Sequence, residues 1–243
     1  MVTAESCSYR VVESPAGPAR GPLADEKLLP LAVDGAAACM WQAPQGLVVP
    51  RTYAAHPGFD AIRSELASQG WPVHVRQSGG GIVPQGTGIL NISLAQRFTG
   101  RPMDHADAFY RHLCALLQIS LLTFGIEARA QAVEGSFCDG RYNLAAGSPA
   151  RKVVGTAQLW RHIPGHDFTH QVAIVHAMVL AQCDTDEATA RANQLEAALG
   201  SGRHYQPESV ASLDHWLPDS RRPGFCSALE DELLDQLRTW PTL

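Results

Sequence analysis

The sequence predicts an α/β (or α+β) domain in which helices flank a mixed central β-sheet. Segments with the two-residue period of a strand alternate with segments of helical period along the 243 residues. The apolar run at residues 171–181 is rich in Val and Ile on both alternating sets of positions, as is typical of a central strand buried on both faces. Alternating strands and helices around such a strand are expected to form a layered domain.

The helices are expected where apolar residues recur every three to four positions, at 23–34, 58–69, 104–123, 184–199 and 226–239. Asp104 is the expected N-cap of the third helix, and Asp184 opens the fourth. Gly70, Gly125 and Gly200 stand where left-handed C-terminal caps belong.

The strands are expected at 38–43, 46–50, 73–76, 89–94, 141–146, 151–160 and 171–181. The 73–76 segment shows the pattern well, because Val73 and Val75 alternate with His74 and Arg76. No repeat, low-complexity tract or long linker divides these elements. We therefore expect a single domain over residues 1–243.

Composition and charge exclude several classes of protein. With 45% hydrophobic, 18% charged and 7% aromatic residues, the chain is neither disordered, collagenous nor a coiled coil. A net charge of −5 gives no overall basic footprint for nucleic acid. No apolar run approaches the roughly 18 residues that span a bilayer, and the first residues do not resemble a signal peptide. We expect a cytoplasmic protein without nucleic-acid or membrane partners.

The cysteines and histidines do not predict a metal site. The six cysteines show neither a CxxC pair nor zinc-finger spacing, so most of them are expected to be buried thiols. His162, His166 and His170 are spaced by four, but Pro164 and Gly165 interrupt any helix that would align them. A polar surface loop is the expected structure there.

A glycine-rich loop between the strands at 73–76 and 89–94 is the most informative segment. Gly79, Gly80 and Gly81 permit backbone conformations closed to other residues and let a ligand approach the main chain. Arg76, at the end of the first strand, can offer a fork of donors to a carboxylate or phosphate. From these residues alone, a ligand-binding loop and a simple connection between two strands both remain open.

Two known phosphate-binding loops do not fit this segment. Thr87-Gly88 stand where a P-loop requires Lys followed by Ser or Thr, and no GxGxxG opens a helix. On the second strand Asn91 and Ser93 share a face, opposite Leu90 and Ile92.

Three blocks resemble the lipoate–protein ligase and octanoyltransferase family. The first is Arg76-x-Ser-Gly-Gly-Gly-x-Val followed by Gly-x-Leu-Asn-x-Ser, the second is Lys152-x-x-Gly-x-Ala-Gln, and the third is His176-Ala177. They occur in the family order and span about residues 70–181. The resemblance implies the catalytic-domain fold of biotin/lipoate protein ligases. One departure is Pro84-Gln85, which stands where ligases usually carry a His-Asp pair, so no ligand role is transferred there.

The segment from Ser136 to Leu144 is similar to the Cys-Pro-Gly-x-Tyr-Asp-Leu segment of cysteine-dependent octanoyl amidotransferases, with Cys138 at the position of their nucleophile. A thiolate suits acyl transfer because it is nucleophilic near neutral pH and leaves readily from a thioester. The resemblance places Lys152 beside the acyl carbonyl, where an ammonium stabilises an oxyanion. It also implies substrate contacts by Arg76, Ser78, Gly79, Gly80, Gly81, Asn91, Ser93, Gly155, Thr156, Ala157 and His176.

The resemblance thus implies an acyltransferase that moves octanoyl or lipoyl onto the lysine of a lipoyl domain, with no cofactor. The implied partners are the glycine cleavage H protein or a 2-oxoacid dehydrogenase E2, and acyl carrier protein as a donor. An ATP-dependent lipoate–protein ligase working through lipoyl-AMP, with ATP and Mg, is the alternative. The expected lack of a C-terminal accessory domain favours the transferase, although a split ligase would look the same.

A third alternative is a non-catalytic module that binds acyl-carrier or lipoyl-domain proteins. For single residues, too, simpler interpretations remain open. Cys138 is then a buried thiol, Lys152 a solvated lysine at a strand end, and His176 a histidine of the core.

Overall fold

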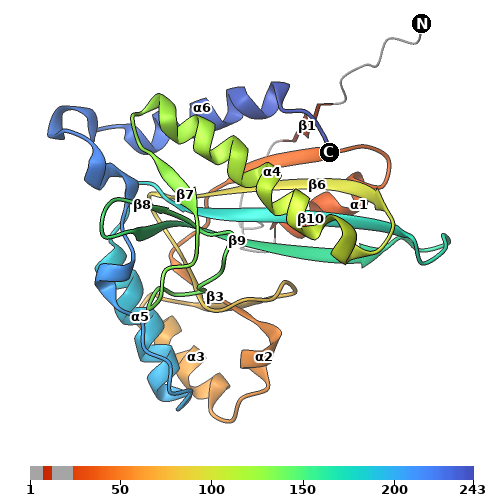
Figure 1. Cartoon of the computed structure of the whole chain (residues 1–243). Coiled ribbons are helices and arrows are strands. Elements are labelled where there is room, and N and C mark those ends of the chain that lie inside the picture. Colours follow the sequence, from red (N-terminus) through yellow and green to blue (C-terminus); the bar gives the residue numbers. More distant parts are fainter. Residues whose placement is uncertain (1–7, 13–23) are drawn as a thin grey trace, which may run out of the picture.

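The computed structural model describes residues 8–12 and 24–243, and its centre is a seven-stranded mixed sheet (Figure 1). The strand order is β1 (Arg10–Val11), β2 (Ala37–Trp41), β6 (Ile89–Thr99), β10 (His170–Leu180), β9 (Arg151–His162), β8 (Leu144–Ala146) and β7 (Ala128–Ala130). Among these described strands only the β1–β2 pair is parallel, and the other five neighbouring pairs are antiparallel. The predicted mixed sheet flanked by helices is confirmed.

One face of this sheet packs against two long helices, α4 (Pro102–Thr123) and α6 (Phe225–Thr239), which lie side by side above it in Figure 1. Successive side chains of β6 and β10 point alternately to this face and to the opposite one. In the core beneath the helices, Leu113 of α4, Leu233 of α6 and Ile92 of β6 are fully buried.

A smaller three-stranded sheet lies against the opposite face, in the order β4 (Val73–Arg76), β3 (Gly46–Pro50) and β5 (Val83–Gln85). Three helices pack with it, as Figure 1 shows at its lower edge: α2 (Arg51–Ala54), α3 (Phe59–Ser68) and α5 (Thr185–Ala198). The short elements η1 (Ala24–Lys27) and α1 (Leu28–Leu31) cover the rest of this face. Space between the two sheets is therefore enclosed by strands on both sides.

The remaining short helices are η2 (Pro207–Ser209), η3 (Leu213–Trp216) and η4 (Asp219–Arg221), which connect α5 to α6. No helix in residues 8–12 and 24–243 combines the length and the apolar character needed to cross a membrane.

Most predicted elements are present, with shifted ends. The expected N-cap at Asp104 is wrong: α4 begins one turn earlier, Arg101 is its N-cap, and Asp104 at N3 accepts from the Arg101 backbone N–H. Pro102 at the first helical position suits this earlier start. Asp184 caps α5 as predicted, and Gly125 follows α4 with a left-handed φ of 77°. Residue 23, the first of the helix predicted at 23–34, lies outside the described residues.

Candidate active site

A pocket lies between the two sheets and contains most of the residues singled out by sequence. Its lining comprises Asp25, Trp41, Val48, Arg76, Val83, Gln85, Asn91, Cys138, Gly155, Thr156, Ala157, His176, Ala177 and Met178. The large sheet supplies one wall and the small sheet the other, and Cys138 enters from the loop between β7 and β8. Most of the exposed lining is apolar, which suits a hydrocarbon chain.

Antiparallel pairing of the three central strands builds the wall on the large sheet. Side chains that face the small sheet form two cross-strand rows, Ser93–His176–Ala157 and Asn91–Met178–Gly155. Because side chains alternate along a strand, the intervening residues of β6 point to the helices instead. The sequence pattern of β6 thus fixes Asn91 and Ser93 on the pocket side.

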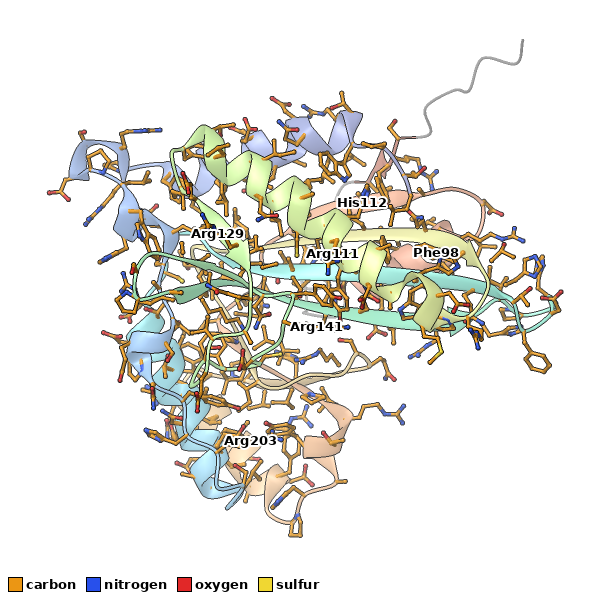
Figure 2. The ribbon with its side chains drawn as sticks, in the orientation of Figure 1. Phe98, Arg111, His112, Arg129, Arg141 and Arg203 are labelled. Atoms are coloured by element: carbon orange, nitrogen blue, oxygen red, sulfur yellow. The ribbon has the colours of Figure 1, made fainter. Side chains whose placement is uncertain are left out.

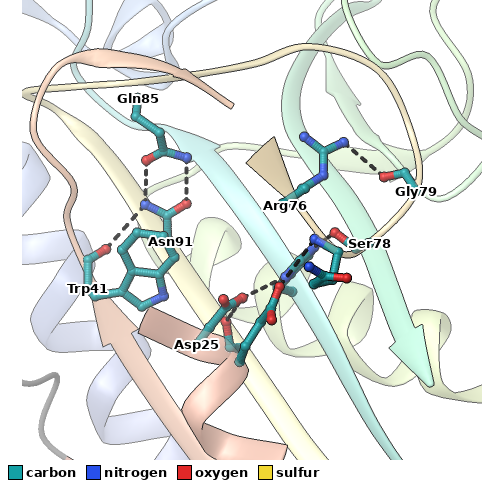
Figure 3. A network of polar contacts seen from close by, with 11 residues as sticks. Asp25, Trp41, Arg76, Ser78, Gly79, Gln85 and Asn91 are labelled. Carbon is teal, nitrogen blue, oxygen red and sulfur yellow. Dashed lines mark hydrogen bonds and ion pairs between the residues drawn. The ribbon is translucent and has the colours of Figure 1, made fainter. Parts of the chain in front are cut away.

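Arg76 folds the glycine loop back on itself. Its guanidinium is buried and donates to the carbonyl oxygens of Val48 at 3.0 Å, Gly79 at 2.8 Å and Gly81 at 2.7 Å. Figure 3 shows the Arg76–Gly79 contact. Burial lowers the pKa of Arg76, against the opposing effect of the nearby thiol and carboxylate. The sequence led us to expect the Arg76 N–H groups to bind a carboxylate or phosphate. Three of them instead donate to backbone carbonyls.

The glycine loop closely approaches the Cys138 thiol. The Gly81 N–H donates to Cys138 Sγ at 3.2 Å. A Cβ added at Gly80, whose φ is 105°, would lie 2.8 Å from Sγ and 2.9 Å from Arg76 Nη2. Only glycine fits between the thiol and the guanidinium, so the triple glycine serves a close backbone approach.

Cys138 has a left-handed backbone conformation, with φ of 51°, which is uncommon for a residue with a side chain. The loop around it is held at several points. The Asp139 carboxylate accepts from the Val133 N–H at 2.8 Å, and Asn143 Nδ2 donates to the Cys138 carbonyl at 2.9 Å. A local conformation of this kind persists where the surrounding contacts determine it, and such positions cluster at functional sites.

Arg141 also anchors this loop, through contacts with α4. It forms an ion pair with Asp107 at 2.8 Å and lies over the Tyr142 ring at 4.9 Å, while Tyr142 stacks on Tyr110. Figure 2 shows Arg141 and Arg111 at this face of the molecule. Because the ion pair is exposed, its net stabilisation is small, and the aromatic stacking carries more of the packing.

Lys152 is fully buried beneath the loop between β7 and β8 (residues 131–143), the nucleophile loop, named for the candidate nucleophile Cys138. Its Nζ donates to the carbonyl oxygens of Phe137 at 2.5 Å and Cys138 at 3.0 Å. Gly155 leaves room for it, since a Cβ there would lie 3.1 Å from Nζ. Burial lowers the pKa of Lys152 to about 8, while Cys138 and Asp139 act in the opposite direction. Lys152 is therefore a buried residue that fixes the loop, and not a solvated lysine.

Asn91 pairs with Gln85 across the pocket through both amide groups, at 3.0 and 2.8 Å, as Figure 3 shows. Thr156 joins β9 to the nucleophile loop, donating from Oγ1 to the Tyr142 carbonyl at 3.0 Å and from N to Asn143 Oδ1 at 3.1 Å. These bonds satisfy buried polar groups that would otherwise face an apolar ligand.

His176 projects from β10 into the pocket beside Asp25 of η1. Nδ1 of the ring lies 2.6 Å from Asp25 Oδ2, and Nε2 lies 3.4 Å from Ser78 Oγ. Ser93 Oγ donates to the same carboxylate oxygen at 3.3 Å. These four polar side chains form one connected network at the pocket wall, in which Figure 3 labels Asp25 and Ser78.

The structure thus brings the predicted site residues together, in two layers. Seven line the pocket: Arg76, Asn91, Cys138, Gly155, Thr156, Ala157 and His176. Six lie directly behind them: Ser78, Gly79, Gly80, Gly81, Ser93 and Lys152.

Sequence reasoning missed several lining residues, among them Asp25, Trp41, Gln85 and Met178. Gln85 belongs to Pro84-Gln85, which stands where ligases of the family usually carry a His-Asp pair. This departure from the family pattern is the sequence feature that could have identified Gln85 as a lining residue. Nothing near Asp25 in the sequence indicates its contact with His176, because the two residues are 151 positions apart.

The other described cysteines differ from Cys138 in their surroundings. Burial raises the pKa of the Cys39 thiol to about 12, that of Cys114 to about 11 and that of Cys183 to about 12. Burial also raises the pKa of Cys226, while Cys7 lies outside the described residues. Thiols that resist ionisation are poor nucleophiles. Cys138 is the cysteine, among those in the described residues, that lines the pocket.

The three spaced histidines lie at or near the tip of the β9–β10 hairpin, where His162 Nε2 contacts the backbone carbonyls of His166 and Asp167. In the described ranges, no three His, Cys, Asp or Glu side chains are arranged to hold a metal ion.

Sequence comparison relates the chain to known proteins. Residues 38–234 match the family described as the lipoyl protein ligase A/B catalytic domain. The chain is 46% identical over 226 residues to an uncharacterised protein of Cupriavidus necator, with 89% of each chain covered. It is 32% identical over 245 residues to the octanoyl-GcvH:protein N-octanoyltransferase of Geobacillus kaustophilus, covering 92% of this chain and 78% of that relative.

Solved structures share the fold at low sequence identity. The bipartite lipoate protein ligase of Thermoplasma acidophilum superposes with a TM-score of 0.61 at 18% identity, covering 94% of this chain and 84% of that one. A lipoate-protein ligase A bound with ATP gives a TM-score of 0.62, also at 18% identity, covering 94% and 86%.

Gly80→Ala is expected to disturb the thiol, because the added Cβ meets Cys138 Sγ at 2.8 Å. The left-handed φ alone should cost about 1–2 kcal/mol of unfolding free energy. Gly165→Ala is the matched control, since Gly165 also has a positive φ but no atom within 4 Å of the added Cβ. Both variants should lose stability in urea titrations, but only Gly80→Ala should change the rate of Cys138 alkylation by iodoacetamide. Equal alkylation rates would contradict the contact.

Lys152 should make the unfolding free energy depend on pH in a defined window. Its pKa is about 8 in the folded chain, and a lysine in an unfolded chain titrates near pH 10.4. Between these values the unfolded chain binds more protons, so the stability contributed by Lys152 rises with pH. Relative to Lys152→Met, the wild type should gain roughly 2.5 kcal/mol from pH 8 to 10.5, measured by urea unfolding under reducing conditions.

Lys27→Met is the control for this measurement, because Lys27 is exposed. Its curve should run parallel to that of the wild type across the whole range. A parallel curve for Lys152→Met as well would show that burial does not depress the pKa of Lys152.

Proposed function

The chain belongs to the lipoyl protein ligase A/B catalytic-domain family, and from this premise we propose that it transfers an octanoyl or lipoyl group to the lysine of a lipoyl domain through a thioester on Cys138. It is an enzyme of the lipoate ligase and octanoyltransferase family. The observation that carries the proposal is the Cys138 thiol at the wall of a largely apolar pocket, with the Gly81 N–H directed at its sulfur.

Transfer through the thiol proceeds in two steps. The Cys138 thiolate attacks the carbonyl carbon of the donor acyl group, the bond from that carbon to the donor nitrogen breaks, and the nitrogen gains a proton as it leaves as an amine. The acceptor lysine amine then attacks the thioester and loses a proton, the carbon–sulfur bond breaks, and the thiolate is released. Backbone N–H groups and the ammonium of Lys152 supply positive charge near the reacting carbonyl and sulfur.

The acyl chain is proposed to occupy the pocket between the sheets. Apolar surface in this pocket comes from Trp41, Val48, Val83 and Met178. The Gln85–Asn91 pair satisfies its own amide groups, so no unpaired polar group of this pair meets the chain.

The proposed reaction uses no ATP. Three of the five N–H groups of the Arg76 guanidinium donate to backbone carbonyls, so this charge in the pocket wall serves to hold the glycine loop and needs no triphosphate partner. The relative in Geobacillus kaustophilus is an octanoyl-GcvH:protein N-octanoyltransferase, which supports octanoyl–H protein as donor and a lipoyl-domain protein as acceptor. Acyl carrier protein is a second donor to be tested.

The proposal is tested by incubating the protein with octanoyl–H protein or octanoyl–acyl carrier protein in the absence of ATP. Intact-mass spectrometry should show an octanoyl adduct that hydroxylamine removes, and Cys138→Ser should form none. Cys226→Ser is the control, because Cys226 lies outside the pocket and should leave the adduct unchanged.

Other outcomes would establish the alternatives. Modification of an apo lipoyl domain only when ATP and lipoate are supplied would identify a ligase. Binding of the donor protein with neither an adduct nor transfer would identify a non-catalytic module. A hydroxylamine-sensitive adduct that persists in Cys138→Ser would place the nucleophile at another residue.

A further inference from the structure

The Asp25–His176 pair is a polar feature of the pocket that the two-step transfer leaves unused. Asp25 is buried, and its Oδ2 lies 2.6 Å from Nδ1 of His176, whose side chain is 21% exposed toward the pocket. Ser93 holds the same carboxylate oxygen from β6. The contact joins η1 to the centre of the large sheet and fixes the orientation of the ring.

The geometry determines which ring nitrogen is free. An ionised carboxylate can only accept hydrogen bonds, so the proton of the neutral ring lies on Nδ1 and the lone pair on Nε2. The neighbour of Nε2 is Ser78 Oγ at 3.4 Å, longer than a well-formed hydrogen bond. Nε2 is therefore weakly engaged and able to exchange a proton with a group in the pocket.

Lys152 is poorly placed for the same task. It is fully buried, it is not part of the lining, and its Nζ donates to the two carbonyls of the nucleophile loop. The titratable and charged groups around His176 in the pocket are Asp25 from η1, Arg76 from β4 and Cys138 from the loop, with Cys39 of β2 next to Asp25. Arg76 stays protonated, so His176 is the available proton acceptor.

Transfer between amines requires such a group. The donor nitrogen must gain a proton to depart as an amine, and the acceptor nitrogen must lose one as its bond to the acyl carbon forms. We propose that His176 Nε2, oriented by Asp25, exchanges these protons with the donor and acceptor lysine amines. This rests on the proposed transfer through Cys138.

The protons balance over the cycle. In the proposed cycle the Cys138 thiol first gives its proton to Nε2 of His176, which leaves a thiolate and a protonated ring. The thiolate attacks, the carbon–nitrogen bond breaks, and Nε2 gives its proton to the departing amine. In the second step the neutral acceptor amine attacks, Nε2 takes the proton that the nitrogen loses, and the carbon–sulfur bond breaks. The thiolate and the protonated ring are restored.

The test separates loading of the thiol from transfer to an amine. The enzyme is loaded from a synthetic octanoyl thioester, whose leaving group departs as a thiolate and needs no proton. Single-turnover transfer to an apo lipoyl domain is then measured beside discharge by hydroxylamine. His176→Gln should load and discharge near the wild-type rates, but its transfer to lysine should be slower by about 10²–10⁴-fold.

The pH profile adds a readout that a structural role would not change. Lysine transfer by His176→Gln should keep rising with pH through about pH 9, because hydroxide replaces the missing base. Asp25→Asn, a change in the positioning residue, should reduce lysine transfer while leaving loading intact, since the ring loses the acceptor that fixes its tautomer. His56→Gln changes an exposed histidine outside the pocket lining and should match the wild type in every assay.

Two results would overturn the inference. One is lysine transfer by His176→Gln within about threefold of the wild-type rate, since loss of a general base costs at least about 10²-fold. The other is an equal slowing of loading, hydroxylamine discharge and lysine transfer, which would make His176 a structural residue. Failure of the proposed function is distinct from both, because the wild-type protein would then form no acyl-enzyme.

Discussion

The buried ammonium of Lys152 holds the candidate nucleophile in place. Its hydrogen bonds to the Phe137 and Cys138 carbonyls compensate part of the cost of burying a positive charge. They also join β9 to a loop in which Cys138 has an uncommon left-handed backbone. Gly155 leaves the space that the ammonium occupies. The position of the thiol in the pocket therefore depends on a contact made beneath it.

The pocket exists because two sheets face each other. The antiparallel strands β6 and β10 of the large sheet direct Asn91, His176 and Met178 to one side, and the small sheet carries Arg76 and Gln85 on the opposite wall. Arg76 uses its donors to bend the glycine loop toward the thiol, and the loop then supplies a backbone N–H. Arg76, which the sequence suggests as a ligand-binding residue, thus also holds the backbone that surrounds the ligand site.

The fold class and the family were predictable because they depend on local patterns: strand and helix periods, the triple glycine, and the block beginning at Lys152. The family is confirmed by the match over residues 38–234. The small sheet was not predicted as a separate unit, because the pairing of β3 with β5 depends on contacts across the fold. Asp25 was missed for the same reason. Lys152 was expected beside the acyl carbonyl, and only tertiary structure shows the two loop carbonyls that it holds.

The most direct test of this account is a crystal structure of the protein after reaction with an octanoyl chloromethyl ketone, an acyl analogue that alkylates thiols irreversibly. The account predicts a covalent bond to Cys138 Sγ, with the hydrocarbon chain between the two sheets against Trp41 and Met178. Lys152 should still contact the carbonyls of the nucleophile loop. A bond to another cysteine, or a chain lying outside the pocket, would contradict it.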